Sequence, residues 1–205
     1  MSESENLIEQ ATTAMMHYEY AFAKNETEKF MWIFADNYLE MAKGRLYGQD
    51  QKLRQAAQFT LTSVLLIILK LFAPFMPHVT EQIYLDLFSK VEGSPSIHRS
   101  PWPHNNPVYY HRQYLELGDV LIAIASAIRR YKSEKGLSLG TKLNQLEIKL
   151  ADPDLQTLLK GALPDLMSIS RAEMIKIVET LNPDLEKLEL EDWEMDMAIS
   201  LVGPE

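Results

Sequence analysis

Hydrophobic residues recur at helical spacing along the first two thirds of the chain. Apolar positions three and four residues apart form a stripe over Glu5–Lys24, which is the pattern of a helix with one buried face. A second stripe, over Glu26–Tyr47, is apolar on more than one side, so this helix should pack on two neighbours. Asn25 and Glu28 fit a capping box at its start. We therefore expect a turn near residue 25 and an antiparallel helix pair.

The stretch Thr60–Phe88 contains the end of one helix, a corner and the start of another. The third helix, over Leu53–Phe72, has an apolar run that Lys70 ends well before the roughly 20 residues that a bilayer requires. We expect this helix to be buried in a soluble protein. Pro74 and Pro77 set the corner, because proline disfavours helix in the preceding residue and is tolerated in the first helical turn. The fourth helix should begin near Pro77.

Residues 89–107 are rich in Pro, Ser and Asn and should not sustain a helix. We expect a long extended loop that three apolar side chains pin to the bundle, those of Ile97, Trp102 and Tyr109. Helical spacing returns over Arg112–Lys132, and Gly136 supplies a C-terminal stop. The chain thus has a fifth helix after the loop.

Beyond the fifth helix the apolar period changes from helical to alternating. Leu146–Leu150 and Trp193–Leu201 alternate apolar and polar residues, as half-buried strands do. Met174–Glu179 reads as a third strand. Between the first and the third of these strands, Asp152 provides an N-cap and Pro153 a first-turn proline for a further helix.

These elements predict an α+β protein. A mainly α-helical antiparallel bundle of about five helices, residues 1–135, should be followed by a small C-terminal α+β subdomain, residues 136–205. The boundary should lie at Lys135–Thr141, where the period changes. A chain of 205 residues with 46% hydrophobic residues is long enough to bury a substantial core.

Three motifs in the bundle resemble a known family. Ala73–Tyr84 reads APFMPHVTEQIY, Ser96–Pro103 reads SIHRSPWP, and Phe34–Tyr47 reads FADNYLEMAKGRLY. In this order and at these spacings they are similar to the C-terminal anticodon-binding helical domain of class I aminoacyl-tRNA synthetases, and the valyl-tRNA synthetases look closest. The resemblance covers residues 1 to about 135. It implies a bundle that docks on the anticodon stem and loop of a tRNA, within a parent enzyme that uses ATP and valine.

The net charge of −9 is unusual for a protein that binds nucleic acid, but it is unevenly distributed. Residues 1–135 hold 14 Lys and Arg against 15 Asp and Glu, whereas residues 136–205 hold 6 against 14. An RNA-facing bundle is therefore compatible with the charge. The absence of cysteine excludes a disulfide framework, and the acidic N-terminal decapeptide lacks the features of a secretory signal. We expect a cytoplasmic protein with no membrane association.

No catalytic motif of the class I synthetases occurs in the sequence. The catalytic domains of that family bind ATP with a His-x-Gly-His element and a Lys-Met-Ser-Lys-Ser loop. Neither is present in this sequence, nor is a glycine-rich phosphate loop. The pairs His78 with Glu81 and His98 with His104 are weak candidates for metal ligation. We expect no catalytic residue, no metal and no cofactor in this chain, with ATP used only by the parent enzyme.

Two groups of basic residues are candidates for contact with RNA phosphates. The first surrounds the end of the second helix and the start of the third: Lys43, Arg45, Lys52 and Arg54. The second lies at the end of the fifth helix: Arg129, Arg130, Lys132 and Lys135. Alternatively, both groups are solvated helix ends whose cations complement the helix dipole.

Aromatic residues are candidates for stacking on unpaired bases. Tyr47, next to Arg45, is the strongest of them. Trp32 is expected in the core and Trp102 as a pin for the loop.

The resemblance therefore implies the tRNA-binding region of a valine–tRNA ligase, with valine tRNA and the remaining N-terminal synthetase domains as expected partners. Asn37 and Gly44 stand where the valyl pattern favours an aromatic and a polar residue, and we expect no C-terminal coiled-coil arm in this chain. The equivalent domain of an isoleucyl- or leucyl-tRNA synthetase and a stand-alone paralogue stay open. The alternative from another class is a synthetase-derived protein-interaction module, which the acidic tail favours.

Overall fold

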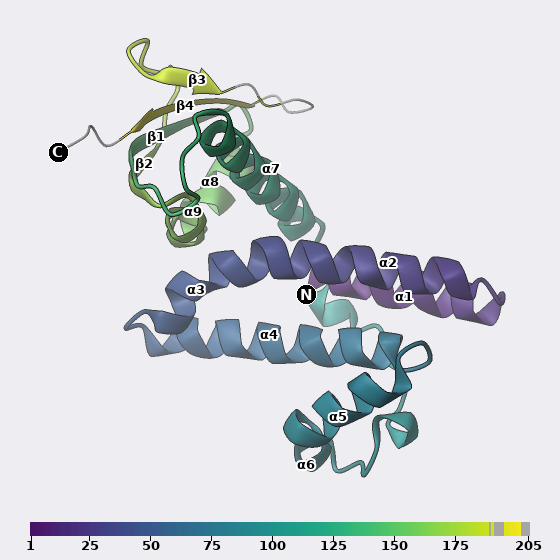
Figure 1. The fold of residues 1–205 in the computed structure, drawn as a ribbon. Helices are drawn as coiled ribbons and strands as arrows, with labels where there is room; N and C mark the ends of the chain where they lie inside the picture. Colours follow the sequence, from purple (N-terminus) through teal and green to yellow (C-terminus); the bar gives the residue numbers. More distant parts are fainter. Residues whose placement is uncertain (189, 191–194, 202–205) are drawn as a thin grey trace. The chain divides into compact units, whose positions relative to one another are not determined.

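The computed structural model of the chain describes residues 1–188, 190 and 195–201 (Figure 1). These residues form two compact units. The helical unit consists of residues 1–36 and 52–112, and the mixed unit consists of residues 37–51 and 113–205. This division differs from the predicted boundary at residue 135, because the fifth predicted helix and the end of the second belong to the mixed unit.

The helical unit has a core shared by three long helices. These are α1 (Ser2–Met16), α2 (Tyr20–Ile33) and α4 (Gln51–Phe72). The α1 and α2 helices lie side by side as a hairpin (Figure 1). Their buried stripes meet that of α4 in one cluster, made of Leu7, Ala11, Ala14, Ala23, Phe30, Val64, Ile68, Leu71 and Phe72.

The turn between α1 and α2 lies eight residues earlier than predicted, because α1 ends at Met16 and not near Lys24. The Glu19 N–H donates to the Ala14 carbonyl at 2.8 Å and the Tyr18 N–H donates to the Met15 carbonyl at 3.2 Å. This bond pair, with Tyr18 at φ 64°, is a Schellman helix end. The expected capping box lies inside α2, where Glu28 instead forms an ion pair with Lys24 at 2.7 Å.

The proline corner is confirmed, since α4 ends at Phe72 and α5 (Pro77–Leu87) begins at Pro77. Short α6 (Ser89–Glu92) follows, and its Glu92 accepts a hydrogen bond from buried Tyr84 and pairs with Lys70 at 2.7 Å. By length and composition alone α4 could cross a membrane. Core helices of soluble proteins meet the same criterion, and α4 buries Val64, Ile68 and Leu71 in the helical unit.

The predicted loop, residues 89–107, begins with the short helix α6, contrary to the prediction that it holds no helix. The segment that follows α6 is pinned to the helical unit as predicted. It contains two short 3-10 turns, η2 (Ile97–Arg99) and η3 (Pro107–Tyr109). The Trp102 indole N–H donates to the Thr12 hydroxyl at 2.9 Å, and the Asn106 N–H donates to the buried Glu5 carboxylate at 2.6 Å. Ile97 is buried, and Tyr109 contacts the Phe59 ring.

The mixed unit is built on a four-stranded sheet with the order β2-β1-β4-β3. Its strands are β1 (Leu143–Leu150), β2 (Ala172–Ile177), β3 (Glu186–Leu188) and β4 (Met195–Leu201). The β1 and β2 strands are parallel and are joined through α8 (Pro153–Gly161) and α9 (Leu163–Ser170), whereas β4 runs antiparallel to β1 and β3.

Three predicted strands and the Asp152-capped helix are confirmed, with the Asp152 carboxylate accepting from two backbone N–H groups. The short β3 and the separate α9 were not predicted. The predicted start of the last strand, Trp193 and Glu194, lies outside the described residues.

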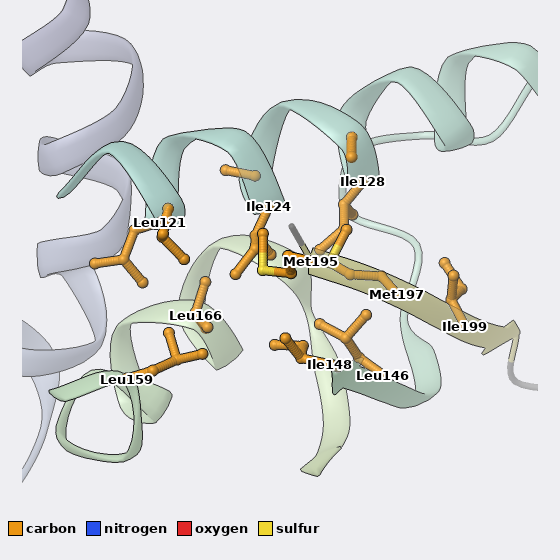
Figure 2. Packing of buried hydrophobic residues seen from close by; sticks show 14 of the residues in the cluster. Leu121, Ile124, Ile128, Leu146, Ile148, Leu159, Leu166, Met195, Met197 and Ile199 are labelled. Carbon is orange, nitrogen blue, oxygen red and sulfur yellow. The ribbon is translucent and has the colours of Figure 1, made fainter. Parts of the chain in front are cut away.

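The core of the mixed unit forms where α7 (Arg112–Glu134) packs on the sheet. Figure 2 shows Leu121, Ile124 and Ile128 of α7 facing apolar side chains of β1 and β4, with Leu159 of α8 and Leu166 of α9 in the same cluster. The α7 helix has the predicted bounds within two residues and ends before Gly136, at φ 65°. Its apolar face, however, packs on a sheet.

Candidate nucleic-acid interface

Most of the predicted contact residues belong to the mixed unit, where α3 (Leu39–Tyr47) packs closely on α9. Gly44 permits this approach, since a Cβ atom there would lie 3.2 Å from the Cβ of Ser168. The Ser168 hydroxyl donates to the Glu40 carbonyl at 3.2 Å. The glycine that departs from the valyl pattern therefore has a packing role.

Arg45 connects α3 to α9 and does not extend into solvent. Its Nε lies 2.8 Å from Oδ1 of Asp165, and both side chains are mostly buried. The guanidinium also lies against the Tyr38 ring, 5.6 Å from its centroid. Burial raises the pKa of Asp165 although Arg45 acts to lower it. Arg45 thus neutralises a partly buried carboxylate, so a primary role for it in phosphate contact is disfavoured.

The segment before α3 is a π-helical turn, η1 (Phe34–Tyr38), and it is tied to α7. An Arg129 guanidinium N–H donates to Oδ1 of buried Asn37 at 2.9 Å. Such turns are frequent at functional sites. Here η1 orients Asn37 toward Arg129. The hydrogen bond links the segment before α3 to the C-terminal half of α7, and both α3 and this half of α7 belong to the mixed unit.

Lys132 cannot contact RNA, contrary to the prediction, because it is only 1% exposed. Its ammonium donates to three backbone carbonyls, those of Leu139 at 3.0 Å, Thr141 at 2.7 Å and Ser170 at 2.9 Å. Burial, with a contribution from Arg171, lowers the pKa of Lys132. The residue holds together the end of α7, the loop after it and the end of α9.

Lys135 is exposed but belongs to a local network. Its ammonium lies 2.7 Å from a Glu186 oxygen and 5.6 Å from the centroid of the Tyr131 ring. The Tyr131 hydroxyl donates to the other Glu186 oxygen at 2.9 Å. Hydrogen bonds from Lys135 and Tyr131 lower the pKa of Glu186. A phosphate would compete with this carboxylate for Lys135.

The exposed candidates are fewer than the sequence suggested. In the mixed unit, Tyr47 is 81% exposed and Arg130 is exposed. Half-exposed Lys43 pairs with Glu40 of its own helix at 2.6 Å. In the helical unit, Lys52 is exposed and Arg54 is half-buried. The first predicted group is therefore divided between the two units.

Trp32 was predicted to lie in the core, and this prediction is wrong, since the residue is 56% exposed on α2. Its helix is continuous with η1 and α3, and the mixed apolar pattern did not show which side faces solvent. The predicted pin at Trp102 is confirmed. Among the described residues, no group of three or more His, Asp or Glu side chains could hold a metal ion.

A helical unit joined to a mixed unit, with exposed Lys, Arg and Tyr side chains on their helices, fits a nucleic-acid-binding domain. Residues 1–149 match the family model described as the anticodon-binding domain of tRNA ligase. The chain belongs to this family of tRNA-ligase domains.

Three similar proteins are valine–tRNA ligases. The chain is 34% identical over 188 residues to a valine–tRNA ligase of Thermococcus kodakarensis. The alignment covers 91% of this chain and 21% of that protein. It is 36% identical over 203 residues to the valine–tRNA ligase of Wolbachia pipientis wMel, and this alignment covers 98% of this chain and 22% of that protein. With that of Rickettsia akari it shares 40% identity over 147 residues, covering 69% and 18%. The chain thus spans about a fifth of the length of these relatives.

Proposed function

We propose that the chain is the tRNA-binding region of a valine–tRNA ligase and contacts the anticodon stem and loop of valine tRNA. The family match over residues 1–149 is the observation that carries this proposal. The similarity to valine–tRNA ligases supports the choice of amino acid over the isoleucyl and leucyl relatives.

The exposed faces of α3 and α7 provide the contacts in this proposal. Lys43 and Tyr47 are four residues apart on α3 and therefore share a helix face. Lys43 and Arg130 would neutralise phosphates, and the exposed Tyr47 ring would stack on an unpaired base. Arg45 and Arg129 would hold α3 in place through Asp165 and Asn37. Lys52 and Arg54 of the helical unit are further phosphate candidates.

The parent protein in this proposal is an ATP-dependent ligase of the cytoplasm. Its remaining synthetase domains would supply the chemistry, because the ATP-binding motifs of class I synthetases do not occur in this sequence. The chain by itself should not activate valine. A valine-dependent exchange of pyrophosphate into ATP by the purified chain would contradict this point.

A salt series with valine tRNA tests the proposal. Each phosphate contact adds a slope of about −0.7 to −0.9 to the dependence of log affinity on log salt. Replacement of Lys43 and Arg130 together by alanine should flatten the slope by somewhat under about 2. The matched control is Lys176→Ala with Lys187→Ala, two exposed cations on β2 and β3, which should leave the slope unchanged.

The same experiment separates RNA binding from a protein-interaction role. A tRNA with an exchanged anticodon should bind less tightly, since bases and not phosphates carry specificity. If the wild-type chain binds no tRNA at low salt, or if only the control variant weakens binding, the proposal fails. The protein-interaction module would then be the better account.

A further inference from the structure

The turn between α1 and α2 exposes large apolar side chains that do not belong to the core of the helical unit. We call Met16, Tyr18, Tyr20 and Phe22 the aromatic turn; all four are exposed, and Tyr18 is 79% exposed. The rings of Tyr18 and Tyr20 meet edge to face with centroids 6.1 Å apart. The turn lies at the end of the α1–α2 hairpin (Figure 1).

The left-handed backbone that this helix end needs at Tyr18 is strained for a tyrosine, whereas glycine would adopt it without strain. Tyr18 occupies the left-handed position of the Schellman end, at φ 64°, where glycine is the usual residue. A tyrosine there lowers stability and places its ring in solvent. Strain that glycine would avoid is a reason to look for a function of the side chain.

A groove of about 390 Å³ adjoins the aromatic turn. It is lined by one face of α1 and the start of α2: Asn6, Glu9, Gln10, Thr13, Ala14, Glu19 and Phe22. None of these lining residues is a cation. Glu9 and Glu19 are exposed to solvent, and in the part of the chain that the structure describes their carboxylates have no hydrogen-bond or ion-pair partner in the protein. A phosphate would be repelled here, whereas a hydrogen-bond donor would be attracted.

We propose that the aromatic turn and its groove bind an unpaired RNA base that carries an exocyclic amino group. The base stacks on a tyrosine ring of the turn, and its amino group donates to Glu9 or Glu19, as carboxylates accept from cytosine N4. Uracil is disfavoured, because it presents a carbonyl at the same edge. This inference rests on the proposed tRNA binding and adds to it a second site, on the helical unit.

A protein partner is the other occupant that an apolar turn could have. The observations favour RNA, because the chain belongs to a tRNA-binding family and because flat, exposed tyrosine rings beside unpaired acceptors match a base. A contact through bases alone should add to the affinity for RNA without changing the slope of log affinity against log salt, because this slope depends on phosphate contacts.

The decisive variant is Tyr18→Gly, which removes the ring and relieves the strained backbone. Its melting temperature should rise by about 2–4 °C, while its affinity for fluorescent oligocytidylate should fall about fivefold to a hundredfold. The salt slope should stay as in the wild type. A structural role for Tyr18 would give the opposite result, namely a less stable protein. Tyr18→Phe, which keeps the ring, and Tyr110→Ala, which removes an exposed tyrosine elsewhere, should bind like the wild type.

The carboxylates are tested by the double variant Glu9→Gln with Glu19→Gln. The wild type should bind oligocytidylate more tightly than oligouridylate, and the double variant should lose this preference. Unchanged oligocytidylate affinity of Tyr18→Gly, or an equal loss for both oligonucleotides in every variant, would overturn the inference. Self-association that Tyr18→Gly abolishes without an effect on RNA would identify the turn as a protein contact and overturn it as well.

The outcomes also distinguish this inference from the proposed function. If the wild type binds valine tRNA and the aromatic-turn variants do so equally well, only the inference fails. If the wild type binds neither valine tRNA nor oligocytidylate at low salt, the proposed function fails and the inference falls with it.

Discussion

At the scale of single residues, the second basic group shows what a sequence does not reveal about a cation. Arg129, Arg130, Lys132 and Lys135 look equivalent in sequence, yet Lys132 is buried and the others are not. Adjacent positions on a helix point about 100° apart, and only the packing of α7 on its neighbours decides which one faces inward. The clustering of basic residues in the sequence predicted where cations gather in the structure. It did not predict which of these cations are exposed to solvent.

Removal of the buried ammonium should cost more stability than removal of an exposed one. Lys132→Met leaves the carbonyls of Leu139, Thr141 and Ser170 without their donor, so the free energy of unfolding should fall by about 3 kcal/mol or more. Lys160→Met, at an exposed position of α8, should change it by less than about 0.5 kcal/mol. Urea denaturation measures both, and equal effects would contradict the assigned role of Lys132.

The Tyr131 hydroxyl should make stability depend on alkaline pH. Burial, with Glu186 as acceptor, raises the pKa of Tyr131 to about 12 from 10.0. The unfolded chain therefore loses this proton first, and the stabilisation that is complete below pH 10 is lost as pH rises toward 12. Tyr131→Phe cannot titrate, so its stability should decline less than that of the wild type over this window. Denaturation curves at several pH values compare the two proteins, and parallel declines would contradict the assignment.

At the scale of secondary-structure elements, the hydrophobic periodicity predicted which face of an element is buried, but not which element packs against it. The apolar stripe of α7 was correctly placed, yet a helix presents the same stripe to a bundle and to a sheet. The α1–α2 turn was missed because its signal, glycine at the left-handed position, is replaced by Tyr18. The separation of α3 from the helical unit was missed because Gly44 reads as a weak helix residue, while in the structure it is a contact point with α9.

The contact at Gly44 predicts a contrast between two helical glycines. A Cβ at Gly118 of α7 would meet nothing within 4 Å, so Gly118→Ala should stabilise by about 0.5–1 kcal/mol through helix propensity. Gly44→Leu should destabilise by about 1–3 kcal/mol, because its side chain would overlap Ser168 and separate α3 from α9. Thermal unfolding measures both variants. A stable Gly44→Leu protein with unchanged hydrogen exchange in α3 would show that the close approach is unimportant.

At the scale of the whole molecule, the chain passes between its two units three times, at residues 36–37, 51–52 and 112–113. A change of hydrophobic period marks where strands begin, and the sequence boundary at residue 135 was drawn there. Cohesion depends on which surfaces bury one another, and α7 buries its apolar face on the sheet. The α+β class was therefore predictable from local pattern, whereas the grouping of elements was not, since it depends on contacts distant in sequence.

This grouping predicts that a shorter fragment folds better than a longer one. Residues 1–135 would include α7 without the sheet, and its buried residues, among them Val120, Ile124 and Ile128, would be exposed. Exposed apolar area of this size favours association, so this fragment should aggregate or show a broad thermal transition by circular dichroism. Residues 1–112 contain the helical unit and omit α7, so they should give a soluble protein with a sharper transition. A monomeric, cooperatively unfolding 1–135 fragment, with α7 amides as protected from exchange as in the full chain, would instead support the boundary drawn from the sequence.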